Sequence, residues 1–221
     1  MYPPVTPLTL GLLAAVLMAL FISVEVGLIE VAYMRLGISP RRITALLMAT
    51  IVGSYVNIPI VRVPAAGLLA DRIVRFWGIP YVVPEAVYRD STLIAANVGG
   101  AVIPALLSLY LLWRFKPFLS VIVATAATTA VVHHFSAVVP GVGVAVPTLI
   151  PGVTAAVAAY LLDRRRTPAV AYIAGTMGCL LGADIMNLGL IAQLHAPVAS
   201  IGGAGTFDGV FVSGIVAVLL A

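Results

Sequence analysis

Long apolar segments separated by short polar ones follow one another along the whole chain. The segment from Phe118 to Leu162, for example, contains no Lys, Arg, Asp or Glu. A span across a bilayer needs about 20 apolar residues, so this segment has room for two spans and a connection. Each span is expected to be a helix, because lipid offers no partners to free backbone groups. The pattern predicts about seven spans, at Leu8–Met34, Ile43–Val61, Leu93–Trp113, Phe118–His133, Thr148–Leu162, Pro168–Gln193 and Gly202–Ala221.

The composition agrees with a membrane location. Hydrophobic residues make up 62% of the chain and charged residues 9%, with a mean hydropathy of +1.15, whereas soluble domains contain roughly 25% charged residues. The sequence therefore predicts an all-α fold, a polytopic transmembrane helix bundle that forms one membrane domain over residues 1–221. The lipid bilayer is the expected partner, and assembly into a homo-oligomer stays open. No nucleic-acid partner is expected, because the basic residues lie singly or in short clusters between the spans.

The loops between these spans differ in their basic residues, which are enriched on the cytoplasmic side of a membrane. The second loop carries four, and the fourth and sixth carry none. The first, third and fifth loops together carry eight, namely Arg35, Arg41, Arg42, Arg114, Lys116, Arg164, Arg165 and Arg166. This predicts a multi-pass protein of the cell membrane with its N-terminus outside and its C-terminus in the cytoplasm.

Residues 62–92 form a sizeable extramembrane loop. Within it, Asp71–Trp77 combines charged with apolar residues, which predicts an interfacial helix. The prolines of Gly78–Pro84 would end that helix. A lid over the outer face and a linker on the membrane surface both fit this pattern.

A glycine-rich pattern recurs before three of the predicted spans, at Val98–Pro104, Val142–Pro147 and Ile201–Asp208. It predicts three related helical hairpins, made of spans two and three, four and five, and six and seven, with the first helix added. Glycine at a helix start leaves backbone N–H groups accessible and gives positive dipole character. Tight packing of helices in lipid is the alternative explanation.

Two aspartates fall where lipid is expected. Asp184 lies inside the sixth predicted span, and Asp208 begins the seventh from the same outer side. A charge in the middle of a membrane helix costs roughly 2.5–3.5 kcal/mol on insertion scales, so such residues are functional candidates. We interpret the two carboxylates as a catalytic or ion-binding pair, although Asp208 also suits a helix cap.

Other polar or small residues map to the same outer half and extend this candidate site. The predicted substrate-binding residues are Asn57, Asn97, Asn187, Gly203 and Gly205. The predicted metal ligands are Asp184, Asp208, His133 and His134. No organic cofactor is indicated, and a bound cation suits these oxygen-bearing side chains. Asparagines that join packed membrane helices are the alternative.

Four segments resemble a known family: Gly53–Pro59, Pro140–Pro147, Gly182–Asp184 and, most specifically, Ser200–Phe211. The chain is similar to the prokaryotic integral membrane proteins catalogued as domain of unknown function 1614. The resemblance covers nearly the whole chain. It implies a multi-span membrane protein of bacteria or archaea and implies no activity.

Three functions stay open. An ion- or proton-coupled transporter fits the intramembrane carboxylates. An intramembrane aspartyl-type hydrolase, a peptidase whose two carboxylates activate water, fits the same pair. However, the aspartates occur in the reverse order of the presenilin-like motifs that they loosely resemble. A non-catalytic assembly subunit is the third. The sequence lacks the Gly-Lys-Ser/Thr and His-Glu-x-x-His motifs, which argues against ATP-driven work and against that type of metallopeptidase.

Overall fold

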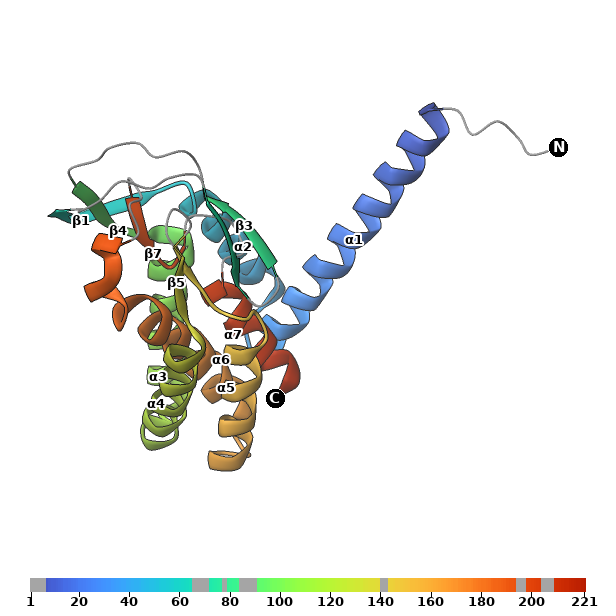
Figure 1. Ribbon diagram of the computed structural model, residues 1–221. Helices are drawn as coiled ribbons and strands as arrows, with labels where there is room; N and C mark the ends of the chain where they lie inside the picture. The colour runs from blue at the N-terminus through green and yellow to red at the C-terminus, as the bar shows by residue number, and fades with distance from the viewer. Residues whose placement is uncertain are drawn as a thin grey trace.

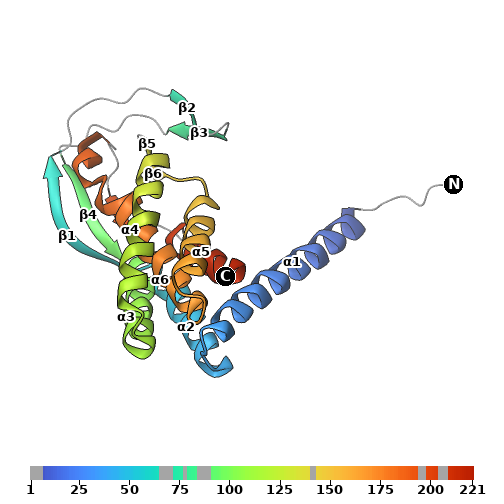
Figure 2. The ribbon, with the colours of Figure 1, turned by 90° about the horizontal axis from the view of Figure 1, so that it is seen from below.

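The computed structural model describes residues 7–64, 72–76, 79–83, 91–139, 143–193, 198–203 and 209–221. The fold is mostly helical (Figure 1), as the apolar segments predict. A bundle of helices carries strands across one end, and the first helix projects away from the bundle in both views (Figures 1 and 2). The α-helices are α1 (Pro7–Arg35), α2 (Pro40–Gly53), α3 (Ile103–Phe115), α4 (Phe118–Phe135), α5 (Ile150–Leu162), α6 (Thr167–Cys179) and α7 (Gly209–Leu220).

In the described ranges, the strands form one three-stranded sheet and two hairpins. In the sheet, β4 (Ser91–Asn97) pairs antiparallel with β1 (Asn57–Pro64) and parallel with β7 (Val198–Ile201). One hairpin joins β2 (Arg72–Phe76) and β3 (Ile79–Val83). The other joins β5 (Ala137–Val139) and β6 (Gly143–Ala145). The three-stranded sheet therefore holds together segments that are more than a hundred residues apart in the sequence.

Among the residues that the structure describes, three shorter helical segments interrupt or extend the α-helices. The π-helical turn η1 (Val98–Val102) lies between β4 and α3, and a second π-helical segment, η2 (Leu180–Ile185), continues α6. The 3₁₀ helix η3 (Leu188–Gln193) follows. Single π-helical turns inside helices occur frequently at functional sites.

The strands correct three of the predicted helices. The predicted span Leu93–Trp113 becomes helical only at Val98, because Leu93–Asn97 belongs to β4, which pairs with β1 and β7. The predicted span Ile43–Val61 is helical only as far as Gly53, and its second part belongs to β1. β-branched residues favour strands, and Pro59 cannot donate a helical hydrogen bond. The interfacial helix predicted at Asp71–Trp77 is also wrong, because Arg72–Phe76 forms β2 and pairs with β3. An apolar run with alternating polar residues satisfies the strand period as well as the helix period.

Four helical stretches in the described part of the chain are long and apolar enough to cross a membrane, and they indicate a membrane protein. They are Ala14–Arg35, Val98–Phe115, Phe118–Phe135 and Thr167–Leu190. The helices α5 and α7, with 13 and 12 residues, extend only about 20 Å, against a hydrocarbon core of about 30 Å. The arrangement in seven spans and three hairpins stays a prediction.

The helix α6 occupies the centre of the bundle and packs against α3, α4, α5 and α7. Small residues allow this close packing: an added Cβ at Gly175 would lie 2.8 Å from the Ser213 carbonyl oxygen, and one at Gly178 would lie 2.6 Å from the Thr128 side chain. Nearly all residues of α6 are buried. A helix that is apolar and buried on every side belongs to the interior of a bundle.

Basic residues gather at the end of α3 that lies away from the strands. The Arg35 guanidinium donates to the carbonyl oxygens of Val218 and Leu219, at 3.1 and 3.2 Å. Arg114 donates to the Gly37 carbonyl oxygen at 3.2 Å. These bonds join the end of α1, the turn before α2, the end of α3 and the end of α7. The first and third predicted loops therefore meet at one end of the bundle.

Candidate functional site

Asn97 ends β4, caps η1, and is fully buried. Its amide nitrogen donates to the Ser54 carbonyl oxygen at 2.8 Å and to the Asn57 side-chain oxygen at 3.2 Å. Its amide oxygen accepts from the Gly100 N–H at 2.8 Å. Both amide hydrogens and the oxygen of Asn97 are thus engaged, and one side chain joins the end of α2, the start of β1 and the start of η1.

Asn57 extends this connection to the third strand. Its side-chain oxygen also accepts from the Ser200 hydroxyl at 2.7 Å, and Ser200 lies on β7. Asn57 itself is exposed, whereas Asn97 behind it is buried. The structure therefore brings together two of the predicted asparagines, at the surface where the three strands meet the helices.

Asp184 lies in η2 and is half-buried. Its carboxylate accepts a hydrogen bond of 2.7 Å from the Gly202 N–H, which immediately follows β7. A hydrogen bond to a carboxylate is roughly twice as strong as one between neutral groups. Asp184 therefore ties the interruption of α6 to the connection that leads toward α7.

Glycines allow the backbone of η1 and the backbone that follows β7 to lie in close contact. Gly202 has φ +81° and Gly203 has φ +76°, a left-handed backbone conformation that glycine adopts without strain. A methyl group on Gly100 would overlap the Gly202 carbonyl oxygen, and one on Gly202 would lie 2.5 Å from the Ala101 nitrogen. Two of the three predicted glycine-rich segments thus touch through their backbones.

These contacts define a polar cluster at the strand end of the bundle, which we call the junction. It consists of Asn57, Asn97, Gly100, Asp184, Ser200 and Gly202. The third glycine-rich segment contributes β6, which contacts η2. The junction therefore joins both π-helical interruptions through a carboxylate and two amide side chains.

Asn187 is buried but is directed to different partners. Its amide donates to the carbonyl oxygens of Gly182 and Ala183, at 3.2 and 2.8 Å, and to the Ser136 hydroxyl at 3.0 Å. It thus satisfies backbone groups of η2 and attaches η2 to the end of α4. A substrate-binding role for Asn187 stays a prediction.

The predicted metal ligands are only partly described. His133 and His134 lie in the last turn of α4 and are exposed. Asp208 and Gly205 lie outside the described residues, so the predicted pairing of Asp184 with Asp208 stays a prediction. Within the described ranges, no group of three or more His, Cys, Asp or Glu side chains is arranged to hold a metal ion.

Sequence reasoning missed Ser54 and Ser200 as members of this region. The helix start at η1 could have been predicted, because Asn97 precedes Gly99 and Gly100, and Asn is a preferred residue before a helix. No comparable sequence pattern marks Ser200 as a member of the region. Its position depends on the parallel pairing of β7 with β4, a contact between distant parts of the chain.

Comparison with known proteins assigns the chain to a family. Residues 51–220 match the family described as Protein of unknown function (DUF1614). The chain belongs to this family. The matched range begins at the end of α2, contains every residue of the junction, and leaves out α1. The resemblance seen in the four sequence segments is thereby confirmed, and the family description assigns no activity. No curated protein and no solved structure matches the chain.

Proposed function

We propose that this protein is a small permease, in which movement of a cation or proton at Asp184 is coupled to transport. The observation that carries the proposal is the bond between the Asp184 carboxylate and the Gly202 N–H, which joins an interrupted membrane helix to a glycine-rich connection. Ionisable residues within membrane helices mark ion and proton pathways. Interrupted helices form the binding sites of many secondary transporters.

The chemistry of the junction supports a cation or proton as the ligand. Carboxylate, amide and backbone carbonyl oxygens are the ligands that hard cations prefer. The π-helical turns η1 and η2 alter the regular pairing of backbone carbonyl oxygens near the carboxylate. Asp184 is half-buried, and Asn57 is exposed, so the junction has a solvent-facing side.

A change in the charge of Asp184 provides the coupling. A protonated or cation-bound carboxylate accepts the Gly202 hydrogen bond more weakly than a free carboxylate does. Loss of that bond would release Gly202, which follows β7, from η2. Gly100 and Gly202 carry no side chain between their two backbones. The backbones can therefore lie in contact while the Asp184 bond is present and move apart when it is lost.

The proposed setting is the cell membrane, with the junction facing outward. The basic residues at the opposite end of the bundle favour a cytoplasmic position for that end. Because α1 begins at the strand side and ends at the basic side, the N-terminus would lie outside and the C-terminus in the cytoplasm. The bilayer is the proposed partner along the exposed apolar helices.

Cation and proton flux into proteoliposomes tests this function. We expect Asp184→Asn to lower the flux at least tenfold, while Asp163→Asn retains it. Asp163 is a suitable control because its carboxylate caps backbone N–H groups at the basic end of the bundle. Wild-type flux in folded Asp184→Asn protein would contradict the proposal. Absence of flux together with cleavage of a membrane peptide by the wild type would replace it with the hydrolase.

A further inference from the structure

The helix α1 carries an ionisable side chain in the middle of an apolar segment. Glu25 lies near the centre of Ala14–Arg35, the part of α1 that is long and apolar enough to cross a membrane. Its side chain is exposed, and no hydrogen bond or ion pair joins it to another described residue. A carboxyl group at this depth is costly in lipid, and such groups are almost always paired or turned toward protein or water. Glu25 therefore indicates a partner that a single copy of the described chain does not supply.

Glu25 belongs to a stripe of side chains along α1 that is buried at one end and exposed at the other. Alternating steps of four and three residues place the members of the stripe on one side of the helix. Toward the end of α1, Ile29 and Ala32 are buried in the bundle. Nearer the start, Met18 and Ile22 are 62% and 53% exposed, and this part of α1 projects away from the bundle (Figures 1 and 2). The side of α1 that packs against the bundle thus continues beyond it.

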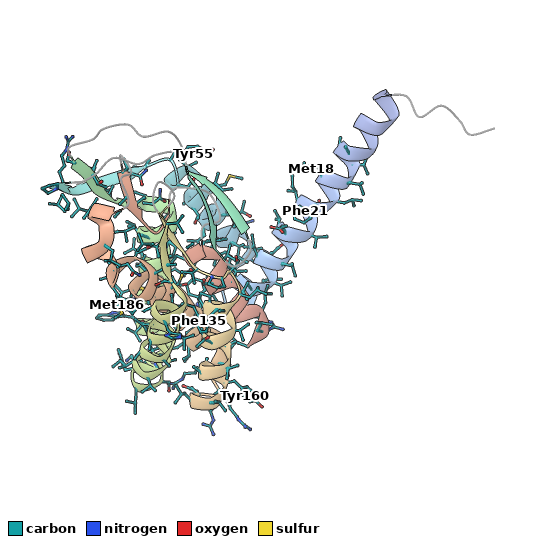
Figure 3. The ribbon with its side chains drawn as sticks, in the orientation of Figure 1. Met18, Phe21, Tyr55, Phe135, Tyr160 and Met186 are labelled. Atoms are coloured by element: carbon teal, nitrogen blue, oxygen red, sulfur yellow. The ribbon has the colours of Figure 1, made fainter. Side chains whose placement is uncertain are left out.

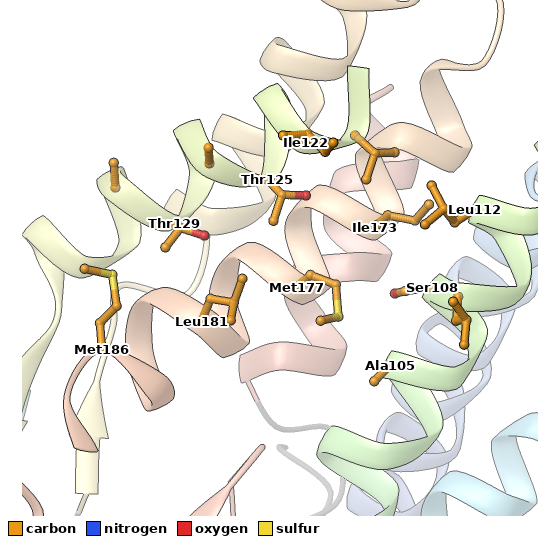
Figure 4. A pocket seen from close by; sticks show the side chains of 14 residues that line it. Ala105, Ser108, Leu112, Ile122, Thr125, Thr129, Ile173, Met177, Leu181 and Met186 are labelled. Atoms are coloured by element: carbon orange, nitrogen blue, oxygen red, sulfur yellow. The ribbon is translucent and has the colours of Figure 1, made fainter. Parts of the chain in front are cut away.

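An apolar groove elsewhere in the bundle shows what lipid alone can cover. The groove has a volume of about 670 Å³ and lies between α3, α4 and α6, and none of the 14 residues that line it is ionisable (Figure 4). Acyl chains can fill this groove without contacting an ionisable group. The exposed stripe of α1 differs because acyl chains offer no hydrogen-bond partner to the carboxyl group of Glu25. The carboxyl group is therefore the reason to expect protein, and not lipid, on this stripe.

A second copy of this chain brings a polar group to the required depth. Copies of one membrane protein share one orientation, which their basic loops determine, so their α1 helices run parallel and their Glu25 side chains lie at the same depth. When two such helices pack around a two-fold axis, equivalent positions face each other. The two Glu25 carboxyl groups then lie side by side, and a protonated one donates a hydrogen bond to the other, as in carboxyl pairs that share a proton.

We propose that two copies of this chain associate through the exposed stripe of α1, which consists of Met18, Ile22 and Glu25. The two Glu25 side chains are hydrogen-bonded to each other within the interface, and the apolar side chains pack on one side of them. Hydrogen bonds between polar side chains are known to hold membrane helices together. The dimer goes beyond the permease function and does not depend on Asp184, which lies in η2.

Disulfide formation in membranes tests the position of the interface. In a Cys179→Ala background, Met18→Cys and Ile22→Cys should each give a disulfide-linked product of twice the mass of the chain, because facing positions lie within the Cα distance of about 4.4–6.8 Å that a disulfide needs. Leu20→Cys is the matched control, since Leu20 is 58% exposed but lies on the opposite side of α1. Its yield should be about tenfold lower. Equal yields at Met18 and Leu20, no disulfide at either stripe position, or linkage to a different protein would overturn the proposal.

Light scattering of the purified protein in detergent tests the role of the carboxyl group. Glu25→Gln keeps a side chain that donates and accepts hydrogen bonds, and this variant should dimerise like wild type. Glu25→Leu suits an exposed membrane helix and should fold, but its dimer should dissociate about tenfold more readily.

Two control variants make this result specific. Glu30→Leu removes the other acidic side chain of α1, which is half-buried and lies off the stripe, and should dimerise like wild type. Asp184→Asn should also dimerise, so that a failure of the permease function and a failure of the dimer are distinguishable. A monomeric wild type, or a Glu25→Leu dimer as stable as that of wild type, would contradict the proposal.

Discussion

At the scale of single residues, the junction depends on a few polar side chains and on glycines that leave no room for a side chain. Asn97 is buried and joins three backbone segments. Its membership of the candidate site was predictable, since it is a polar residue before two glycines at the start of a span. The partners of Asn97 were not predictable, because Ser54 and Asn57 come close only once β1 pairs with β4.

Gly100 offers a sharp test of the backbone contact. Gly100→Ala should lower the free energy of unfolding by about 2–4 kcal/mol, because the added methyl group overlaps the Gly202 carbonyl oxygen. Gly189→Ala is a matched control, since an added Cβ there meets nothing within 4 Å, and its effect should stay within about 0.5 kcal/mol. Chemical unfolding in detergent measures both. Equal stability of the two variants would show that the glycine-rich segments do not touch.

At the scale of the elements, hydrophobic runs predicted the helices well and the strands poorly. Both boundaries of α4 and the start of α6 follow from the apolar pattern alone, whereas α6 ends at Cys179, well before the predicted Gln193. The second predicted span failed at β1, since a short apolar run fits a strand and a helix equally. The sequence did not predict the π-helical interruption η2. Within it, Gly182 packs against α4, where an added Cβ would lie 2.6 Å from the Thr129 carbonyl oxygen.

The end of α7 depends on a side chain of α1. Arg35→Ala should lower the free energy of unfolding by about 0.5–1 kcal/mol, because it removes a cation and two hydrogen bonds from the last carbonyl oxygens of α7. Arg41→Ala, an exposed arginine on α2, provides the comparison and should change stability less. Thermal unfolding in detergent measures the difference. A larger loss in Arg41→Ala would contradict this account of the contact between α1 and α7.

At the scale of the whole molecule, α1 differs from the rest of the chain. Figure 3 shows Met18 and Phe21 projecting from this helix outside the bundle, and both are more than half exposed. Its last turns pack against α2 and α7, and the family match begins after it, at residue 51. The apolar pattern predicted this helix as a span, and its separation from the bundle could not be read from that pattern.

The proposed orientation can be tested with single cysteines. Cys179 is the one cysteine of the chain and is buried, so Cys179→Ala gives a background without thiols. In that background, His134→Cys at the strand end should react with a membrane-impermeant maleimide added to intact cells. Arg165→Cys at the basic end should react only after lysis. Both native residues are exposed, and the reverse pattern of labelling would place the N-terminus in the cytoplasm.

The central claim is that Asp184 handles a cation or proton at the junction. The most direct test is the thermal stability of the purified wild type, Asp184→Asn and Asp163→Asn across a panel of alkali and alkaline-earth cations and across pH. A ligand that binds only the folded protein raises its stability by mass action. We expect at least one condition to raise the unfolding temperature of wild type and Asp163→Asn alike and to leave that of Asp184→Asn unchanged. The same response in all three proteins, or no response in any, would contradict it.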